Sequence, residues 1–344
     1  MKKVVIIILI IIAITSGIIL TTKFTKEGEN TELNNVQVNN VEEQEEKVEE
    51  QKDIEIFKGN DRPIAVMIDN VGDARPQAGL NDAYMVYEIT VEGKLTRLMA
   101  LFKNVDLEKL GPVRSARHYF IDYVLENDAI YTHFGCSIIA EQHLKDLNID
   151  HIDGMLESSK TFWRVSDKAA PHNVATSTEK LLKVANRKGY RTTSDKDSVL
   201  NYVSSNIELE NGISATEVSI PYTSTYKVSY KYDENTKRYT RAYNGTTHKD
   251  WKTKENVTTK NIIITFAKNY TIPEHAVGDL QELENIGSLD GYYITNGKAI
   301  KIKCEKSSRK EQTVYKDLEG NEIIVNDGNT FIQIVPIDTQ VGVK

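Results

Sequence analysis

Arginines in one short segment of the first half of the chain are well suited to binding a ligand. The segment Gly111-Pro-Val-Arg-Ser-Ala-Arg117 places Arg114 and Arg117 three positions apart, at the expected start of a helix. Side chains three apart on a helix face the same side, and an arginine fork can bind a carboxylate or phosphate through two hydrogen bonds. The segment therefore predicts a site for an anionic or carboxylate-bearing ligand.

Other arginines, histidines and carboxylates fall at expected strand ends and loops, where sites tend to be built. The candidate ligand-binding residues are Arg75, Arg97, Arg114, Arg117, His133, Arg164, His172 and Asn173. The candidate catalytic carboxylates are Glu88, Glu92 and Asp69. The alternative for each residue is a structural role as a surface charge, a cap or half of a buried ion pair.

The carboxylates also suit an enzyme that cleaves wall glycan or peptide. Glycan cleavage needs a positioned acid and often a second carboxylate, which Glu88 and Glu92 or Asp69 would supply. Arginines would stabilise developing negative charge, and His133 or His172 would serve as a base in another chemistry. The sequence has no G-x-S-x-G, H-E-x-x-H or Walker signature, which weakens this hypothesis.

Aromatic residues near these positions have two candidate roles. Tyr87, Tyr119, Phe162 and Trp163 would offer stacking faces for a sugar or peptide, although the core is the commoner place for such residues.

The first half of the chain predicts the elements that position these residues. Apolar runs at 64–68, 83–90, 95–102 and 129–134 are typical of strands, and helical periodicity marks 115–126, 138–147 and 178–188. Strands that alternate with helices indicate an α/β-type domain over residues 58–205.

The second half has the character of β-structure. Residues 226–232 alternate with period two, and 237–243 return after a turn, which is the pattern of a hairpin. Further strands are expected at 261–267, 291–295, 299–303 and 331–335. We predict a mainly antiparallel β domain over 206–344, so the whole chain is of the α+β class.

The amino terminus predicts a membrane anchor over residues 1–23. Two lysines precede an uncharged stretch from 4 to 22, which is long enough to cross a bilayer as a helix. The lysines favour a cytoplasmic amino end and place the rest of the chain outside the cytoplasm. The alternative is a cleaved signal peptide, although the apolar stretch is long for one and no A-x-A-like site follows it.

An acidic tether is expected over residues 24–57. Eleven acidic residues and four lysines between 26 and 58 account for the net charge of −7, and this composition is typical of disorder. The rest of the 344-residue chain is neutral overall, which argues against nucleic acid as a partner.

The cysteines and histidines do not predict a metal site. Cys136 and Cys304 lie in different expected domains, so two separate thiols are favoured over a disulfide. His248 and Asp250 are too few to hold a metal, and a hydrogen bond at a hairpin end is the better interpretation. We expect neither a metal nor a cofactor.

Ordered motifs in both halves are shared with one known family. They are Arg62-Pro-Ile-Ala-Val-Met-Ile-Asp-Asn70, Arg75-Pro-Gln-Ala-Gly-Leu80, Val86-Tyr-Glu88, Thr96-Arg97, residues 111–117, Ala170-Pro-His-Asn173, Tyr230-Lys-Tyr-Asp233, Tyr239-Thr-Arg241, His248-Lys-Asp250 and Phe331-Ile-Gln333. Over about 60–340 the chain resembles the YerB-type lipoprotein family of Gram-positive bacteria, a two-part domain of unknown function. The resemblance implies an extracytoplasmic location and two domains. Many relatives carry a lipid-attachment cysteine, and here the expected transmembrane anchor replaces it.

Three hypotheses about function follow. The first is a membrane-anchored binding or accessory protein of the cell envelope, which recognises an anionic or carboxylate-bearing wall ligand through the arginines. The second is a peptidoglycan-cleaving hydrolase or lyase that uses Glu88 and Glu92. The third is a platform on which an envelope protein docks.

Overall fold

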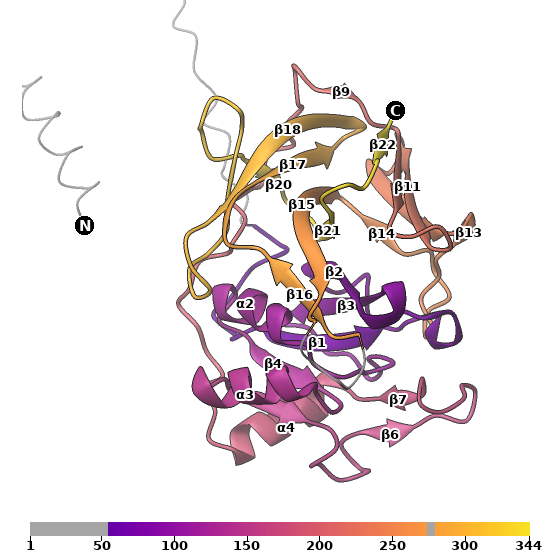
Figure 1. The fold of residues 1–344 in the computed structure, drawn as a ribbon, viewed down its shortest axis with the longest axis vertical. Coiled ribbons are helices and arrows are strands. Elements are labelled where there is room, and N and C mark those ends of the chain that lie inside the picture. Colours follow the sequence, from indigo (N-terminus) through magenta and orange to yellow (C-terminus); the bar gives the residue numbers. More distant parts are fainter. Residues whose placement is uncertain (1–53, 274–278) are drawn as a thin grey trace, which may run out of the picture. The chain divides into compact units, whose positions relative to one another are not determined.

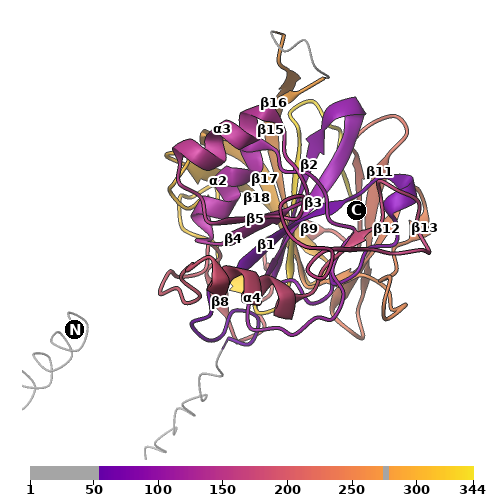
Figure 2. The same cartoon turned by 90° about the horizontal axis from the view of Figure 1, so that it is seen from below.

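The computed structural model describes residues 54–273 and 279–344 (Figures 1 and 2). Its helices are α2 (His118–Glu126), α3 (Ile138–Asp146) and α4 (Thr178–Arg187), and its 3-10 turns are η1 (Gly72–Ala74) and η2 (Glu92–Lys94). The strands of the main sheet are β1 (Ile64–Asp69), β2 (Met85–Val91), β3 (Leu95–Phe102), β4 (Ile130–His133), β5 (His151–Asp153), β9 (Ile213–Ser214), β15 (Asn261–Thr271), β16 (Gln281–Glu284), β17 (Gly287–Thr295), β18 (Lys298–Lys306), β19 (Val314–Lys316) and β21 (Thr330–Pro336). The second sheet contains β10 (Glu217–Pro221), β11 (Lys227–Asp233), β12 (Arg238–Tyr243), β13 (Thr246–Thr247), β14 (Thr258–Thr259) and β22 (Gly342–Val343). Two short pairs complete the fold, β6 (Trp163–Arg164) with β7 (Val174–Ala175) and β8 (Tyr202–Val203) with β20 (Val325–Asn326).

The main sheet is built from both halves of the chain. Its strand order is β19-β18-β17-β15-β21-β2-β3-β1-β4-β5, with β16 paired to β15 and β9 to β18. Strand β21 lies between β15 and β2 and is parallel to both, so that Phe331 stands opposite Val86 and Ile262. At the other end of the sheet, β1, β4 and β5 are parallel, and their carboxyl ends therefore lie at one edge.

The central strands are buried on both faces. Every residue of β1 and β2 is buried, which explains why their sequences are nearly continuous apolar runs. One face packs against α2 and α3 through residues such as Met67, Tyr87 and Phe120. The opposite face packs against the second sheet and α4 through residues such as Val86 and Val228. Two hydrophobic cores thus share the main sheet.

Most of the expected elements are confirmed within a few residues, including the four early strands, the three helices and the β11–β12 hairpin. The two halves do not form separate sheets. The described residues after 53 belong to one compact unit, and β15, β17, β18 and β21 extend the sheet that β1–β5 begin. The second half is mainly antiparallel, as expected, and β21 is an exception because it pairs in parallel with both of its neighbours.

The predicted membrane anchor at 1–23 and the tether as far as residue 53 lie outside the described residues. Within the described ranges, the helices are all too short or too polar to cross a membrane. The last residues of the expected tether belong to the folded unit. The backbone N–H groups of Glu55 and Ile56 donate to the Asp327 carboxylate, and the Phe57 ring lies edge-on to Tyr84 at 5.1 Å.

A buried ion pair joins the two sheets. Nη2 of Arg241, on β12, lies 2.8 Å from Oε2 of Glu88, on β2, and neither side chain is exposed to solvent. The other oxygen of Glu88 accepts hydrogen bonds from Asn70, Thr96 and Tyr226, at 2.8–3.0 Å. Burial alone would lower the pKa of Arg241, but the charge of Glu88 outweighs it, so the pKa rises well above its usual value. Arg241 is therefore charged in the folded state.

Removing the charge of Glu88 is expected to destabilise the fold strongly. In Glu88→Gln the buried guanidinium of Arg241 loses its counterion, and a loss of this kind costs about 3–5 kcal/mol. The measurement is the free energy of unfolding in urea at pH 7. The matched control is Glu284→Gln, which breaks the exposed pair of Glu284 with Lys268 and is expected to cost less than about 1 kcal/mol. Equal losses in the two variants would contradict the structural role of Glu88.

Candidate functional site

The carboxyl end of β1 is the meeting point of the predicted site residues. Asp69 ends β1 and stands opposite Arg97 of β3 in the antiparallel register. The segment 113–116 crosses the same edge, because the Arg114 N–H donates to Met67 and the Ala116 N–H donates to Gly135. Residues from β1, β3 and the segment before α2 are thereby brought together.

A glycine before this segment allows its close approach. Gly111 has a φ of +133°, and an added Cβ would lie 2.7 Å from the backbone oxygen of Val174 and 2.9 Å from the nitrogen of Val113. Contacts this short are not tolerated with backbone atoms, and the positive φ is itself unfavourable for other residues. Gly111 is therefore required for the path that carries the following arginines to the edge of the sheet.

Three arginines and two carboxylates form what we call the arginine cluster: Arg97, Arg114, Arg117, Asp69 and Glu92. Nε of Arg114 lies 3.3 Å from Oδ2 of Asp69, and Nε of Arg117 lies 2.7 Å from Oε1 of Glu92. Arg97 donates to the backbone oxygen of Ser115 at 2.6 Å, and Arg117 donates to that of Ala116 at 2.7 Å. The backbone of the segment that carries Arg114 and Arg117 thus orients the side chains of Arg97 and Arg117.

The charges of the arginine cluster leave an excess of one positive charge. Burial lowers the pKa of Arg97 to about 10, the charge of Arg117 adds to this effect, and Glu92 and Asp69 oppose it. Burial would raise the pKa of Glu92, but the hydrogen bond and charge of Arg117 outweigh it and lower that pKa. Arg97 is thus a buried cation whose charge is only partly balanced by Glu92 and Asp69. An anion bound beside it would stabilise that charge.

Other predicted residues lie next to the arginine cluster or apart from it. Nδ1 of His172 lies 2.7 Å from Oδ2 of Asp69, so His172 adjoins the cluster. Arg164 and Asn173 bond to each other at 2.6 Å in the β6–β7 pair, where they hold that pair together. Arg75 lies over the rings of Tyr226 and Tyr243, with its Cζ 4.6 and 4.4 Å from their centroids.

Glu88 is not part of the arginine cluster. Its carboxylate lies between the sheets, bonded to Arg241, as described above. The same buried network includes His248, whose Nδ1 accepts from Arg241 and whose Nε2 donates to Gln77 at 2.6 Å. Burial, followed by the charge of Arg241, lowers the pKa of His248 well below its usual value, so its ring is neutral.

Sequence analysis missed Arg241 and Gln77 as partners in this network. Arg241 occupies an inward position in the alternation of β12, between Tyr239 and Tyr243. A charge at an inward position of a strand is a signal for a buried partner. For Gln77 we find no such signal in the sequence.

His133 belongs to a second group at the carboxyl ends of β4 and β5. Its ring is buried, stacks on His151 at 5.2 Å between centroids, and bonds to the Gly135 backbone oxygen and to Nδ1 of His151. Burial lowers the pKa of His133 to about 4, although Asp153 opposes this. A neutral, fully bonded ring at this position holds the strand ends in register.

The remaining expectations concern aromatic residues, cysteines and metals. Tyr87, Tyr119 and Phe162 are buried core residues, and Trp163 is half-buried. Cys136 and Cys304 are separate free thiols, as expected, and burial raises the pKa of each. Asp250 accepts from the N–H groups of Gly79, Lys252 and Thr253, which is a structural role. In the described part of the chain, no three metal-ligating side chains come together.

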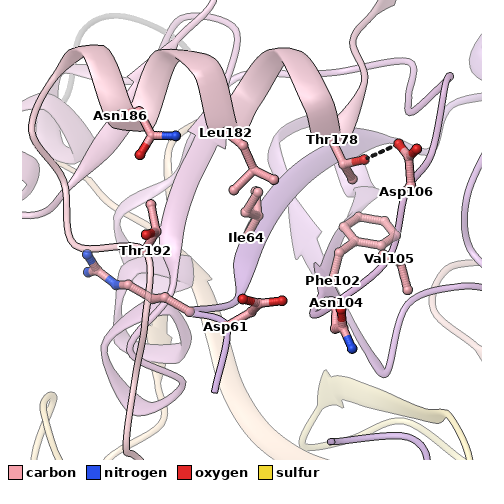
Figure 3. Close-up of a pocket in the computed structure, with 11 residues that line it drawn as sticks. Asp61, Ile64, Phe102, Asn104, Val105, Asp106, Thr178, Leu182, Asn186 and Thr192 are labelled. Carbon is pink, nitrogen blue, oxygen red and sulfur yellow. Dashed lines mark hydrogen bonds between the residues drawn. The ribbon is translucent and has the colours of Figure 1, made fainter. Parts of the chain in front are cut away.

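A cavity of about 450 Å³ lies at the opposite end of β1, beneath α4 (Figure 3). Ile64, Phe102 and Leu182 supply its apolar surface, and Asp106 accepts a hydrogen bond from Thr178 at its rim. It is lined by none of the candidate site residues. The cavity is therefore separate from the arginine cluster.

Comparisons with known proteins agree in one family. A family described as "Protein of unknown function (DUF3048) N-terminal domain" matches residues 50–191, and its C-terminal domain matches residues 218–332. The chain is 32% identical to YerB of Bacillus subtilis (strain 168), named as a candidate lipoprotein, over 286 residues, which is 80% of this chain and 81% of that protein. The fold is similar to the crystal structure of the YerB protein from Bacillus subtilis, with a TM-score of 0.73 and 29% identity, over 82% of this chain and 94% of that one.

The neutral state of His133 predicts a loss of stability in acid. Because its folded-state pKa is depressed, its contribution is fully present above the unfolded value of about 6.5 and is lost as the pH falls towards 4. We expect the free energy of unfolding to fall by roughly 1 kcal/mol between pH 7 and 5.5 on account of this group. Urea unfolding at several pH values is the measurement. The His133→Gln protein should show a shallower dependence over this range, and an unchanged slope would contradict the assignment.

Proposed function

The chain belongs to the DUF3048 family, and from this premise we propose that it is a membrane-anchored, extracytoplasmic binding or accessory protein of the cell envelope. The apolar stretch at 4–22 and the acidic residues after it support an anchor and a tether. The relative YerB is named as a candidate lipoprotein, which supports a location on the outer side of the cytoplasmic membrane. The folded unit would then stand close to the outer face of the cytoplasmic membrane.

We infer that the arginine cluster binds an anionic ligand of the wall. The observation that carries this inference is the gathering of Arg97, Arg114 and Arg117 around only two carboxylates at one edge of the sheet. Arg114 is the most accessible of the three, with 28% of its side chain exposed. Arginine forks bind carboxylates and phosphates through paired hydrogen bonds, so either group would fit.

The same contacts give less support to a wall hydrolase. A general acid must reach its substrate and keep its proton near neutral pH. Glu88 is fully buried and paired with Arg241, and the pKa of Glu92 is lowered by Arg117, opposite to what an acid needs. The arginine cluster suits binding of a stable anion better than protonation of a leaving group.

Two components of a Gram-positive wall carry anionic groups that the arginine cluster would bind. One is the carboxylates of peptidoglycan stem peptides, and the other is the phosphates of a wall-linked anionic polymer. Sacculi that retain the polymer and sacculi stripped of it with hydrofluoric acid separate these two sources. Binding to both would identify the peptidoglycan, and binding only to the first would identify the polymer.

Loss of Arg114 is expected to weaken wall binding. Purified full-length protein in detergent is incubated with sacculi, and the bound fraction is measured by sedimentation. A hydrogen bond to a charged group is worth about 1.5–3 kcal/mol, so Arg114→Ala should bind roughly 10- to 100-fold more weakly. Added salt should weaken wild-type binding as well.

The control for this experiment is Arg187→Ala. Arg187 is an exposed arginine on α4 that pairs with Glu157, and its loss removes the same charge as the loss of Arg114. It is expected to bind as wild type does. Equal binding by Arg114→Ala and wild type would overturn the proposed site. Release of soluble fragments from the sacculi would favour the hydrolase. If the protein does not sediment with the sacculi but crosslinks to an envelope protein in cells, the docking platform would be favoured.

A further inference from the structure

The outer edge of strand β18 has a gap in its pairing. One edge of β18 pairs along its whole length with β17. On the opposite edge, β9 pairs with residues 298–299 and β19 pairs with residues 303–305. In the described part of the chain, no strand pairs with residues 300–302 on this edge. At the usual rise of a strand, the gap between the two partner strands is about 13 Å long.

The backbone of Lys301 points into this gap. The Gly297 oxygen accepts a hydrogen bond from the Ala215 N–H on the same edge. Alternate residues of an antiparallel strand direct their N–H and C=O groups to the same side. Ala299 and Lys303 therefore face β9 and β19, whereas Lys301, between them, faces the gap. Its N–H and C=O groups are thus available to an incoming extended segment.

The gap opens into a groove with apolar walls. The groove has a volume of about 520 Å³, and residues of two segments, 208–213 and 317–319, line it together with β18. Ile213 and Leu318, one from each segment, are 55% and 63% exposed, so both apolar side chains are available for contact. Tyr292 lines the groove as well and is half-buried. Exposed apolar side chains beside an open strand edge are typical of a surface that binds a peptide.

The groove is negatively charged. Its charged lining residues are Glu208, Glu210, Asp317, Glu319 and Lys301. Four negative charges against one positive charge leave a net charge of −3. This field favours the approach of a positively charged segment and repels an acidic one.

Charge and length disfavour two other occupants. The chain's own segment before residue 54 has the wrong charge, because residues 42–50 contain six glutamates and one lysine. A second copy of the chain would need a long open edge to form a continuous sheet, whereas β9 and β19 close this gap at both ends. The occupant that fits is a short extended segment of another protein.

We propose that this groove binds a short, extended, basic segment of a partner protein. About three residues of the segment pair with β18 at Lys301, its apolar side chains contact Ile213 and Leu318, and its lysines or arginines face the carboxylates. This site goes beyond the anion-binding role of the arginine cluster and does not depend on it. The chain would bind a wall anion and a protein segment through separate surfaces.

The test measures the binding of two labelled heptapeptides to the full-length protein by fluorescence anisotropy, in an uncharged detergent. The first probe alternates lysine and valine, and the second has glutamate in place of each lysine. We expect saturable binding of the lysine peptide, at least about 10-fold tighter than that of the glutamate peptide and weaker in added salt. A proline at the centre of the lysine peptide should weaken binding as well, because it removes a backbone N–H.

Variants in the groove should bind the lysine peptide more weakly. Glu319→Lys reverses a charge at an exposed position, and Leu318→Ser removes an exposed apolar contact. Each is expected to weaken binding about 3- to 10-fold without loss of stability. The matched controls are Glu255→Lys and Ile337→Ser, which make the same changes at exposed residues that do not line the groove.

Three results would overturn the docking groove: no saturable binding of the lysine peptide by wild type, equal binding of the two peptides, or no difference between the groove variants and their matched controls. A photo-crosslinking residue at position 318 tests the other two occupants. Crosslinks to residues 24–53 of the same chain, or to a second copy, would also overturn the proposal. Arg114→Ala should bind the lysine peptide as wild type does, so failure of the anion site leaves this result intact.

Discussion

The ion pair between Glu88 and Arg241 is the constraint on which the arrangement of the two sheets depends. A buried charge is tolerated only when a partner of opposite charge and several hydrogen bonds surround it. Here the partner comes from the other sheet, and Asn70, Thr96 and Tyr226 complete the shell. Sliding β12 by one residue along the second sheet would turn Arg241 to the outer face and leave Glu88 alone in the core. The pair therefore fixes how the two sheets meet.

The outer site is coupled to this inner network through two consecutive residues. Asp69 directs its carboxylate to Arg114 and His172, whereas Asn70 directs its amide to Glu88 and Tyr226. Gln77 bonds to the backbone oxygen of Asp69, to the side chain of Asn70 and to His248. The position of the arginine cluster is thus set by the same contacts that hold the sheets together.

The sequence was sufficient for the local structure and for part of the site. Apolar runs revealed β1–β4. The expectation that Arg114 and Arg117 share a helix face was wrong, because α2 begins only at His118 and Arg117 is in extended backbone. The two arginines lie in the same cluster because the segment before α2 crosses the edge of the sheet. The role of Glu88 could not be predicted in the same way, because its partner Arg241 is far away in the chain. In the sequence, a catalytic carboxylate and an ion-paired carboxylate within an apolar strand give the same local pattern. The position of β21 between β2 and β15 was equally hidden, since strand order depends on contacts between distant segments and not on local pattern.

The place of β21 has a consequence for how the chain folds while it is being synthesised. The edge of β2 that faces away from β3 is occupied only by β21, which is among the last strands to be synthesised. Until those residues arrive, the apolar strand β2 presents unpaired backbone groups, and such an edge readily pairs with other chains. Folding of the early segment thus waits for the carboxyl end, and sheets with such long-range parallel pairs fold slowly. A chain released early would carry an open edge, and a chaperone that covers this edge would protect the chain during that interval.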